Sequence, residues 1–183
     1  GQSFFIGLFN SSIRETLSIT HGQFGTIYAS ATLFSSLLLI WIGKKIDDVN
    51  VIKFAIFVTI LLSFSSFFFS KTSSVAFLFV AIFLMRFSGQ GLMSHTASTT
   101  ISRYFIKSRG KALSIIWFGL SSAEFIMPVL IVYLLTLFVW QDLWVTFSLL
   151  VLICLPLASY LLVKDVKLDT RESNQNENLK EEN

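Results

Sequence analysis

The chain has 183 residues, of which 54% are hydrophobic and 14% are charged, with a formal net charge of +3 and one cysteine. Soluble domains carry about a quarter charged residues, so this composition argues against a soluble enzyme and favours a membrane bundle. A single cysteine rules out a disulfide framework. The basic residues cluster beside apolar segments, which argues against a nucleic-acid partner.

Five segments are predicted to be complete transmembrane helices, because each reaches or approaches the ~20 apolar residues that cross ~30 Å of hydrocarbon. They are 24–43, 52–70, 75–100, 112–139 and 143–163. The apolar start, GQSFFIGLF, is too short to cross and is interpreted as the outer end of a span whose beginning is missing. We therefore expect six spans in an all-α membrane bundle over residues 1–164, in contact with the lipid bilayer.

The distribution of basic residues predicts the orientation. Of the 14 Lys and Arg residues, Arg14 and Lys71 lie on one side, Arg86 lies within a span, and the other eleven lie on the opposite side. The positive-inside rule makes that richer side cytoplasmic. Trp140 and Trp144 fall near the other interface, as in an aromatic belt. The polar residues 165–183 are expected to form a disordered cytoplasmic linker.

The connection GKKIDDVNVIK, residues 43–53, resembles the loop signature of the major facilitator superfamily. Gly43 and Asp47 match the signature in spacing, whereas Asp48 and Asn50 replace a basic residue and a second glycine. In that family the loop aspartate meets a helix end in the other half of the protein and helps to hold the outward-open state. A solvated, charged loop is the alternative interpretation.

The connection RYFIKSRGKALSI, residues 103–115, resembles a stretch of the monocarboxylate-transporter branch of the same family. Tyr104, Phe105 and Lys107 carry this resemblance, and Arg109 is typical of facilitators more broadly. A basic loop with an interfacial aromatic pair explains most of the same pattern. Arg103 and Arg109 are grouped with the glycine and aspartate of the first loop as conformational residues.

The resemblance implies a fold of twelve helices in two halves, with a substrate held between them near the middle of the membrane. This chain would be the N-terminal six-helix half with its first helix truncated, and the missing C-terminal half would be its partner. Residues 165–183 would connect the two halves. The resemblance also implies secondary active transport by alternating access, in a plasma or inner cell membrane.

Arg86 lies in the stretch AIFLMRFSGQGLMSH, about twelve residues into a span and so at a depth of roughly 18 Å. A charge at that depth costs at least ~2.5 kcal/mol, so the side chain should face protein or water. Gln90 follows four residues later on the same helical face. A structural ion pair is the alternative to a role in substrate binding or coupling.

Glu124 lies in the next span, roughly 20 Å from its cytoplasmic end, and shares a face with Trp117 and Ser121. We expect it to pair with Arg86 or, unpaired, to carry a coupling proton. The predicted substrate-binding or coupling residues are therefore Arg86, Gln90, Trp117, Ser121 and Glu124.

The sequence contains no metal-ligand cluster, nucleophile–base arrangement or phosphate-binding loop, so we expect neither an enzyme nor a cofactor. A guanidinium binds a carboxylate through two parallel hydrogen bonds. The preferred prediction is a secondary transporter of a small organic anion such as a carboxylate. An efflux transporter of another substrate class, and a non-transporting facilitator-like receptor or scaffold, stay open as alternatives.

Overall fold

The computed structural model describes residues 3–42, 51–104 and 109–163, and all the elements in these ranges are helices. The elements are α1 (Ser3–Gly7), α2 (Asn10–Leu17), α3 (His21–Ile42), α4 (Val51–Ser70), α5 (Val75–Met85), η2 (Arg86–Met93), α6 (Ser94–Tyr104), α7 (Arg109–Leu137) and α8 (Trp140–Val163). Side-chain surroundings are not described for 51–52, 102–104, 109 and 158–163. The predicted connection 43–50 and linker 165–183 lie outside the described residues.

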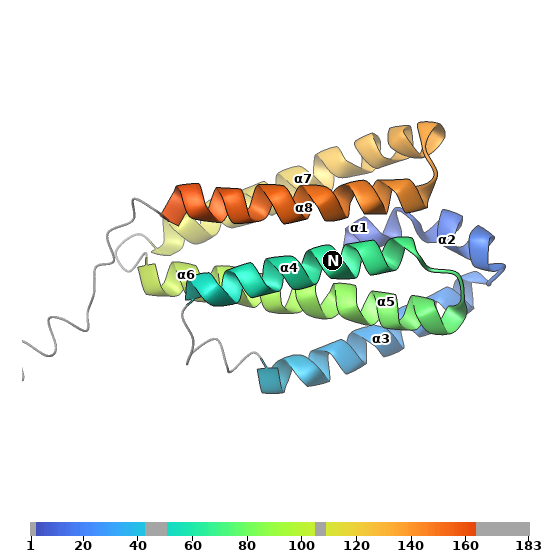
Figure 1. Cartoon of the computed structure of the whole chain (residues 1–183), viewed down its shortest axis with the longest axis horizontal. Coiled ribbons are helices and arrows are strands. Elements are labelled where there is room, and N and C mark those ends of the chain that lie inside the picture. Colours follow the sequence, from blue (N-terminus) through green and yellow to red (C-terminus); the bar gives the residue numbers. More distant parts are fainter. Residues whose placement is uncertain (1–2, 43–50, 105–108, 164–183) are drawn as a thin grey trace, which may run out of the picture.

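The helices form one bundle whose long members run alternately up and down (Figure 1). Helix α4 packs along α8 on one side and along α5 and η2 on the other, and α3 also lies against α5 and η2. Helices α1 and α2 lie at the end of the bundle that holds the α4–α5 and α7–α8 turns (Figure 1). Five helices are long and apolar enough to cross a membrane, as the sequence predicted.

Local capping decides where the spans begin. Thr20 and Gln23 form a reciprocal cap at the start of α3, with Thr20 N donating to Gln23 Oε1 at 2.8 Å and Gln23 N donating to Thr20 Oγ1 at 3.2 Å. The Ser74 hydroxyl likewise accepts from Phe77 N at the start of α5. Such caps satisfy N–H groups that have no partner inside the helix. Helix α3 therefore begins at His21, three residues before the predicted apolar span.

Trp140 and Trp144, which the sequence placed near the outer interface as in an aromatic belt, do not face lipid. Both side chains are buried, and Trp144 is only 1% exposed. Its ring centroid lies 4.6 Å from that of Phe69, 5.2 Å from that of Phe9 and 5.5 Å from that of Phe5. Because α1 folds against this end of the bundle, these rings become part of the protein core instead of meeting lipid.

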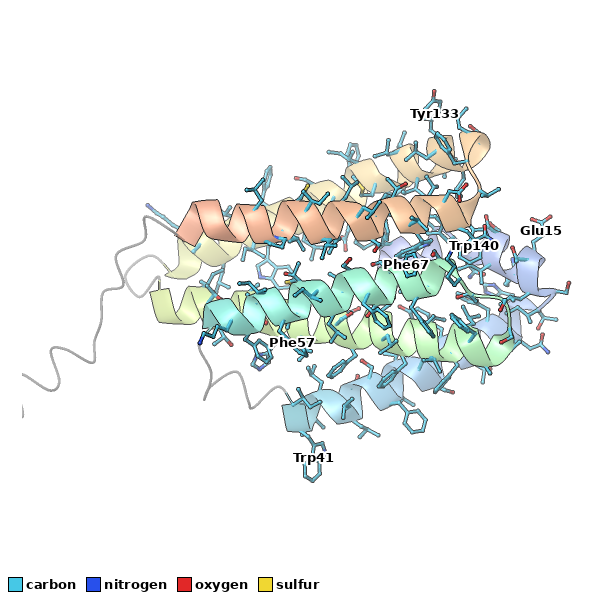
Figure 2. The ribbon with its side chains drawn as sticks, viewed as in Figure 1. Glu15, Trp41, Phe57, Phe67, Tyr133 and Trp140 are labelled. Atoms are coloured by element: carbon cyan, nitrogen blue, oxygen red, sulfur yellow. The ribbon has the colours of Figure 1, made fainter. Side chains whose placement is uncertain are left out.

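Other large apolar side chains point away from the bundle, as expected for a protein surrounded by lipid. Trp41 on α3 and Tyr133 on α7 project outward (Figure 2) and are well exposed.

Between α4 and α8, in contrast, polar groups hold the helices together. Ser63 Oγ and Ser148 Oγ each donate to the other residue's backbone carbonyl at 2.9 Å. Interhelical hydrogen bonds of this kind contribute about 0.6 kcal/mol on average in membranes.

The third complete span is not a continuous α-helix. Its middle, η2, is an eight-residue π-helix, in which hydrogen bonds run from residue i to residue i+5. Gly91 lies in this segment, where an added Cβ would come within 3.2 Å of the Leu39 side chain on α3. The glycine therefore permits close packing of η2 on α3. Gln90, the i+4 neighbour that the sequence placed on the Arg86 face, still lies beside it, because both side chains bond to Ser3.

Candidate functional site

Arg86 is the first residue of η2 and is 8% exposed. Its Nη1 donates to Ser3 Oγ on α1 at 2.7 Å, and its Nε donates to Thr32 Oγ1 on α3 at 3.2 Å. The guanidinium carbon lies 5.4 Å from the centroid of the Tyr28 ring, which is a cation–π distance. Two helices that are distant from η2 in sequence, α1 and α3, thus hold one cation.

The charge of Arg86 has no counter-ion among the residues that the structure describes, because its partners there are two hydroxyl groups and a neutral ring. A guanidinium has five N–H donors, and two of them are used in these bonds. The Tyr28 hydroxyl is also buried without a hydrogen-bond partner in the described ranges. An anion that reached this site would find an uncompensated charge and unused donors.

Gln90 extends the cluster of polar side chains around Arg86 along η2. Ser3 Oγ, which accepts from Arg86, donates in turn to Gln90 Oε1 at 3.3 Å. The amide nitrogen of Gln90 makes no hydrogen bond within the described part of the chain. Arg86, Ser3 and Gln90 therefore form a polar row that ends in free N–H donors.

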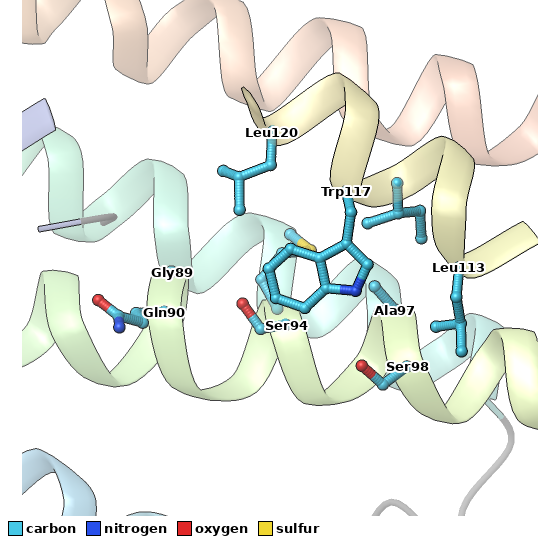
Figure 3. A pocket seen from close by; sticks show the side chains of 10 residues that line it. Gly89, Gln90, Ser94, Ala97, Ser98, Leu113, Trp117 and Leu120 are labelled. Carbon is cyan, nitrogen blue, oxygen red and sulfur yellow. The ribbon is translucent and has the colours of Figure 1, made fainter. Parts of the chain in front are cut away.

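A pocket of about 470 Å³ lies beyond Gln90, between η2 and α6 on one side and α7 on the other (Figure 3). It is lined by Gly89, Gln90, Met93, Ser94, Ala97, Ser98, Leu113, Ile116, Trp117 and Leu120. The Trp117 ring extends from α7 towards Ser94 and Ala97 (Figure 3) and is 63% exposed. This volume falls in the usual range for small-molecule sites.

The structure brings together only some of the residues that the sequence predicted. Arg86 and Gln90 are joined through Ser3, and Gln90 and Trp117 line the same pocket. Ser121 and Glu124 are exposed and do not line that pocket.

The expected pair between Arg86 and Glu124 is not formed in this conformation. The Arg86 side chain reaches to α1 and α3, whereas Glu124 is exposed on α7, and the described residues contain no ion pair between the two. Hydroxyl groups on α1 and α3 take two of the guanidinium donors instead.

The structure gives little information on the four predicted conformational residues. Gly43 and Asp47 lie in the stretch 43–50, which is outside the described residues. Arg103 lies in α6 and Arg109 begins α7, but their side-chain surroundings are not described. Their roles stay predictions.

Sequence reasoning missed the three residues that hold Arg86. Ser3, Tyr28 and Thr32 carry no local pattern that distinguishes them from other small or aromatic residues of a membrane helix. Their role depends on which helices meet, and Thr32 is only one of several hydroxyl residues in its span. Among the described residues there is no group of His, Cys, Asp and Glu that could hold a metal ion.

Comparison with known families gives one match. The family described as the Major Facilitator Superfamily matches residues 1–181. This match does not confirm the monocarboxylate-transporter branch. No curated protein and no solved structure matches the chain. With five candidate spans and an all-helical described structure, the match shows that this integral membrane chain belongs to the Major Facilitator Superfamily, whose members are membrane transporters of small molecules rather than enzymes.

Proposed function

We propose that the chain forms the N-terminal half of a secondary transporter that carries a small organic anion, such as a carboxylate, by alternating access. The observation that carries this proposal is the buried Arg86, whose charge is not compensated among the described residues. A buried charge in a membrane is costly unless it is paired. A carboxylate supplies the missing charge and accepts two N–H groups in parallel.

The neighbours of Arg86 suit reversible binding. Hydroxyl groups and a tyrosine ring hold the side chain in position without neutralising it. A permanent ion pair would have to be broken each time a substrate bound, whereas these neutral partners leave the charge available. Guanidinium geometry is also well defined, because its planar group is held at both Nε and Nη1.

We propose that a C-terminal half of the same protein closes the site, and that residues 165–183 connect the halves on the cytoplasmic side. Gly43, Asp47, Arg103 and Arg109 then act as conformational residues at the cytoplasmic ends of the helices. Glu124 is proposed as the site of a coupling proton.

Transport by the full-length protein in proteoliposomes tests the proposed function. The panel contains radiolabelled acetate, hexanoate and phenylacetate, with choline as a cation and glucose as a neutral solute. We expect uptake of at least one carboxylate, saturable and competed by the others, and no uptake of choline or glucose. Uptake of choline or glucose without any carboxylate uptake would reject the anion proposal.

The proposed orientation predicts the accessibility of introduced cysteines. In a Cys154→Ser background, which removes the exposed native thiol, Lys71→Cys should react with a membrane-impermeant maleimide added to intact cells. Lys111→Cys should react only after permeabilisation, because it lies at the basic end of the bundle. The opposite labelling pattern would reverse the topology.

Glu124 is predicted to influence transport through the proton and not through a fixed bond to Arg86. In the full-length transporter, Glu124→Gln should slow proton-driven uptake several-fold and leave carboxylate affinity unchanged or tighter. Ser122→Ala is the matched control, since the Ser122 hydroxyl bonds only to the Phe118 carbonyl of its own helix. A double-mutant cycle with Arg86→Lys measures the coupling between the two residues. Effects on uptake that are not additive would show that Arg86 and Glu124 are coupled, whereas additive effects would show that the two residues act independently.

A further inference from the structure

The pocket beside Gln90 has a chemical character of its own. Its wall on α7 is apolar, and hydroxyl groups stand opposite on α6 (Figure 3). The apolar wall consists of Leu113, Ile116, Trp117 and Leu120, whereas the opposite side carries Ser94 and Ser98. A small inorganic anion would leave most of this apolar wall unused, because the pocket volume is about 470 Å³.

Trp117 is the side chain that gives this wall its flat surface. It is 63% exposed and extends into the space between α7 and α6 (Figure 3). It lies eight residues after the start of α7, about 12 Å along the helix. Trp144 is buried in the core and Trp41 points away from the bundle, whereas Trp117 lines a pocket between helices.

Gln90 connects this wall to the charge of Arg86. It borders the pocket and is joined to Arg86 through the Ser3 hydroxyl. Its amide nitrogen is free to donate within the described part of the chain. Gln90 is thus a member both of the pocket that Trp117 lines and of the polar row that ends at Arg86.

We infer that the transported anion is a carboxylate that carries a flat aromatic ring. The carboxylate accepts from Arg86 and Gln90, and the ring stacks on Trp117 in the pocket. Stacking between aromatic rings adds about two- to tenfold in affinity beyond the area that is buried. This inference rests on the proposed function and adds the chemical class of the substrate.

Equilibrium binding of three acids to the purified full-length transporter tests the inference. Phenylacetate supplies a ring, hexanoate supplies an aliphatic body of similar size, and acetate supplies the carboxylate alone. We expect phenylacetate to bind at least tenfold more tightly than acetate and at least threefold more tightly than hexanoate. Trp117→Ala should weaken phenylacetate binding about tenfold, and Trp117→Phe should weaken it less, because phenylalanine keeps a flat ring.

Trp41→Ala is the matched control, since Trp41 is an exposed tryptophan on α3 that does not line the pocket. It should leave all three affinities unchanged, and melting temperatures of the variants show whether each is folded. Equal binding of hexanoate and phenylacetate, or an unchanged phenylacetate affinity in Trp117→Ala, would overturn the inference. In either case carboxylate binding that is lost in Arg86→Gln would still support the proposed function. Absence of binding by all three acids would overturn both.

Discussion

Replacing Arg86 with lysine is expected to lower the carboxylate affinity of the full-length transporter by roughly 10- to 100-fold. Lysine keeps the positive charge, so a purely electrostatic role would survive the change. It loses the planar group that now donates to Ser3 and Thr32 from separate nitrogens and that would present parallel N–H groups to a carboxylate. Hydrogen bonds to charged groups contribute about 1.5–3 kcal/mol, which corresponds to this loss in affinity.

Carboxylate binding and initial uptake rates should be measured on the same preparations. Arg14→Lys is the matched control, because Arg14 lies on α2 and its Nε donates to Asn10 Oδ1 of the same helix at 2.7 Å. That substitution should leave binding and uptake unchanged. Arg86→Gln, which removes the charge, should reduce uptake further than Arg86→Lys. If Arg86→Lys binds and transports as the parent does, the arginine is structural and the anion proposal fails.

Replacing Trp144 with alanine is expected to give the largest loss of stability in the described bundle. Its side chain is fully enclosed among Phe5, Phe9 and Phe69, so truncation removes contacts on every side and leaves a cavity. Substitutions of this kind in packed cores cost about 3–5 kcal/mol. The change should lower the melting temperature of the detergent-purified full-length transporter and should loosen α1, which carries Phe5.

Two further substitutions make this test specific. Trp41→Ala removes the same atoms from a side chain that is 78% exposed and should shift the free energy of unfolding by no more than about 0.5 kcal/mol. Trp144→Phe should cost much less than Trp144→Ala, because it keeps an aromatic ring and removes an indole N–H that is buried without a partner in the described residues. Equal melting temperatures for Trp144→Ala and Trp41→Ala would mean that the aromatic core does not hold this end of the bundle.

The predictions for Arg86 and Trp144 are linked through α1, which carries both Ser3 and Phe5. Loosening α1 by Trp144→Ala is expected to disturb a hydrogen-bond partner of Arg86, although Trp144 and Arg86 share no hydrogen bond or ring contact in the described part of the chain. The aromatic core is therefore part of what positions the guanidinium. This relation was not visible in the sequence, where Ser3 belongs to a short apolar start without a distinguishing pattern.

The sequence by itself determined the features that depend on local composition. Apolar segments of the required length specified five spans, because a membrane-crossing helix must satisfy its own backbone and bury apolar side chains in lipid along its whole length. The arginine at mid-span marked a candidate functional position, since an intramembrane charge is costly and has to face protein or water. Gln90 and Trp117 were also identified from helical spacing, and both line the pocket.

Tertiary structure alone decided the partners of these residues. Arg86 bonds to Ser3 and Thr32, which are 83 and 54 residues away along the chain, and not to Glu124. The span is π-helical over Arg86–Met93, whereas the sequence indicated a regular α-helix. Trp144 faces the core and not the lipid because α1 packs over it. Each of these outcomes depends on which helices come into contact, and helix contacts in a membrane follow from shape and hydrogen bonding between distant segments, which local hydropathy does not encode.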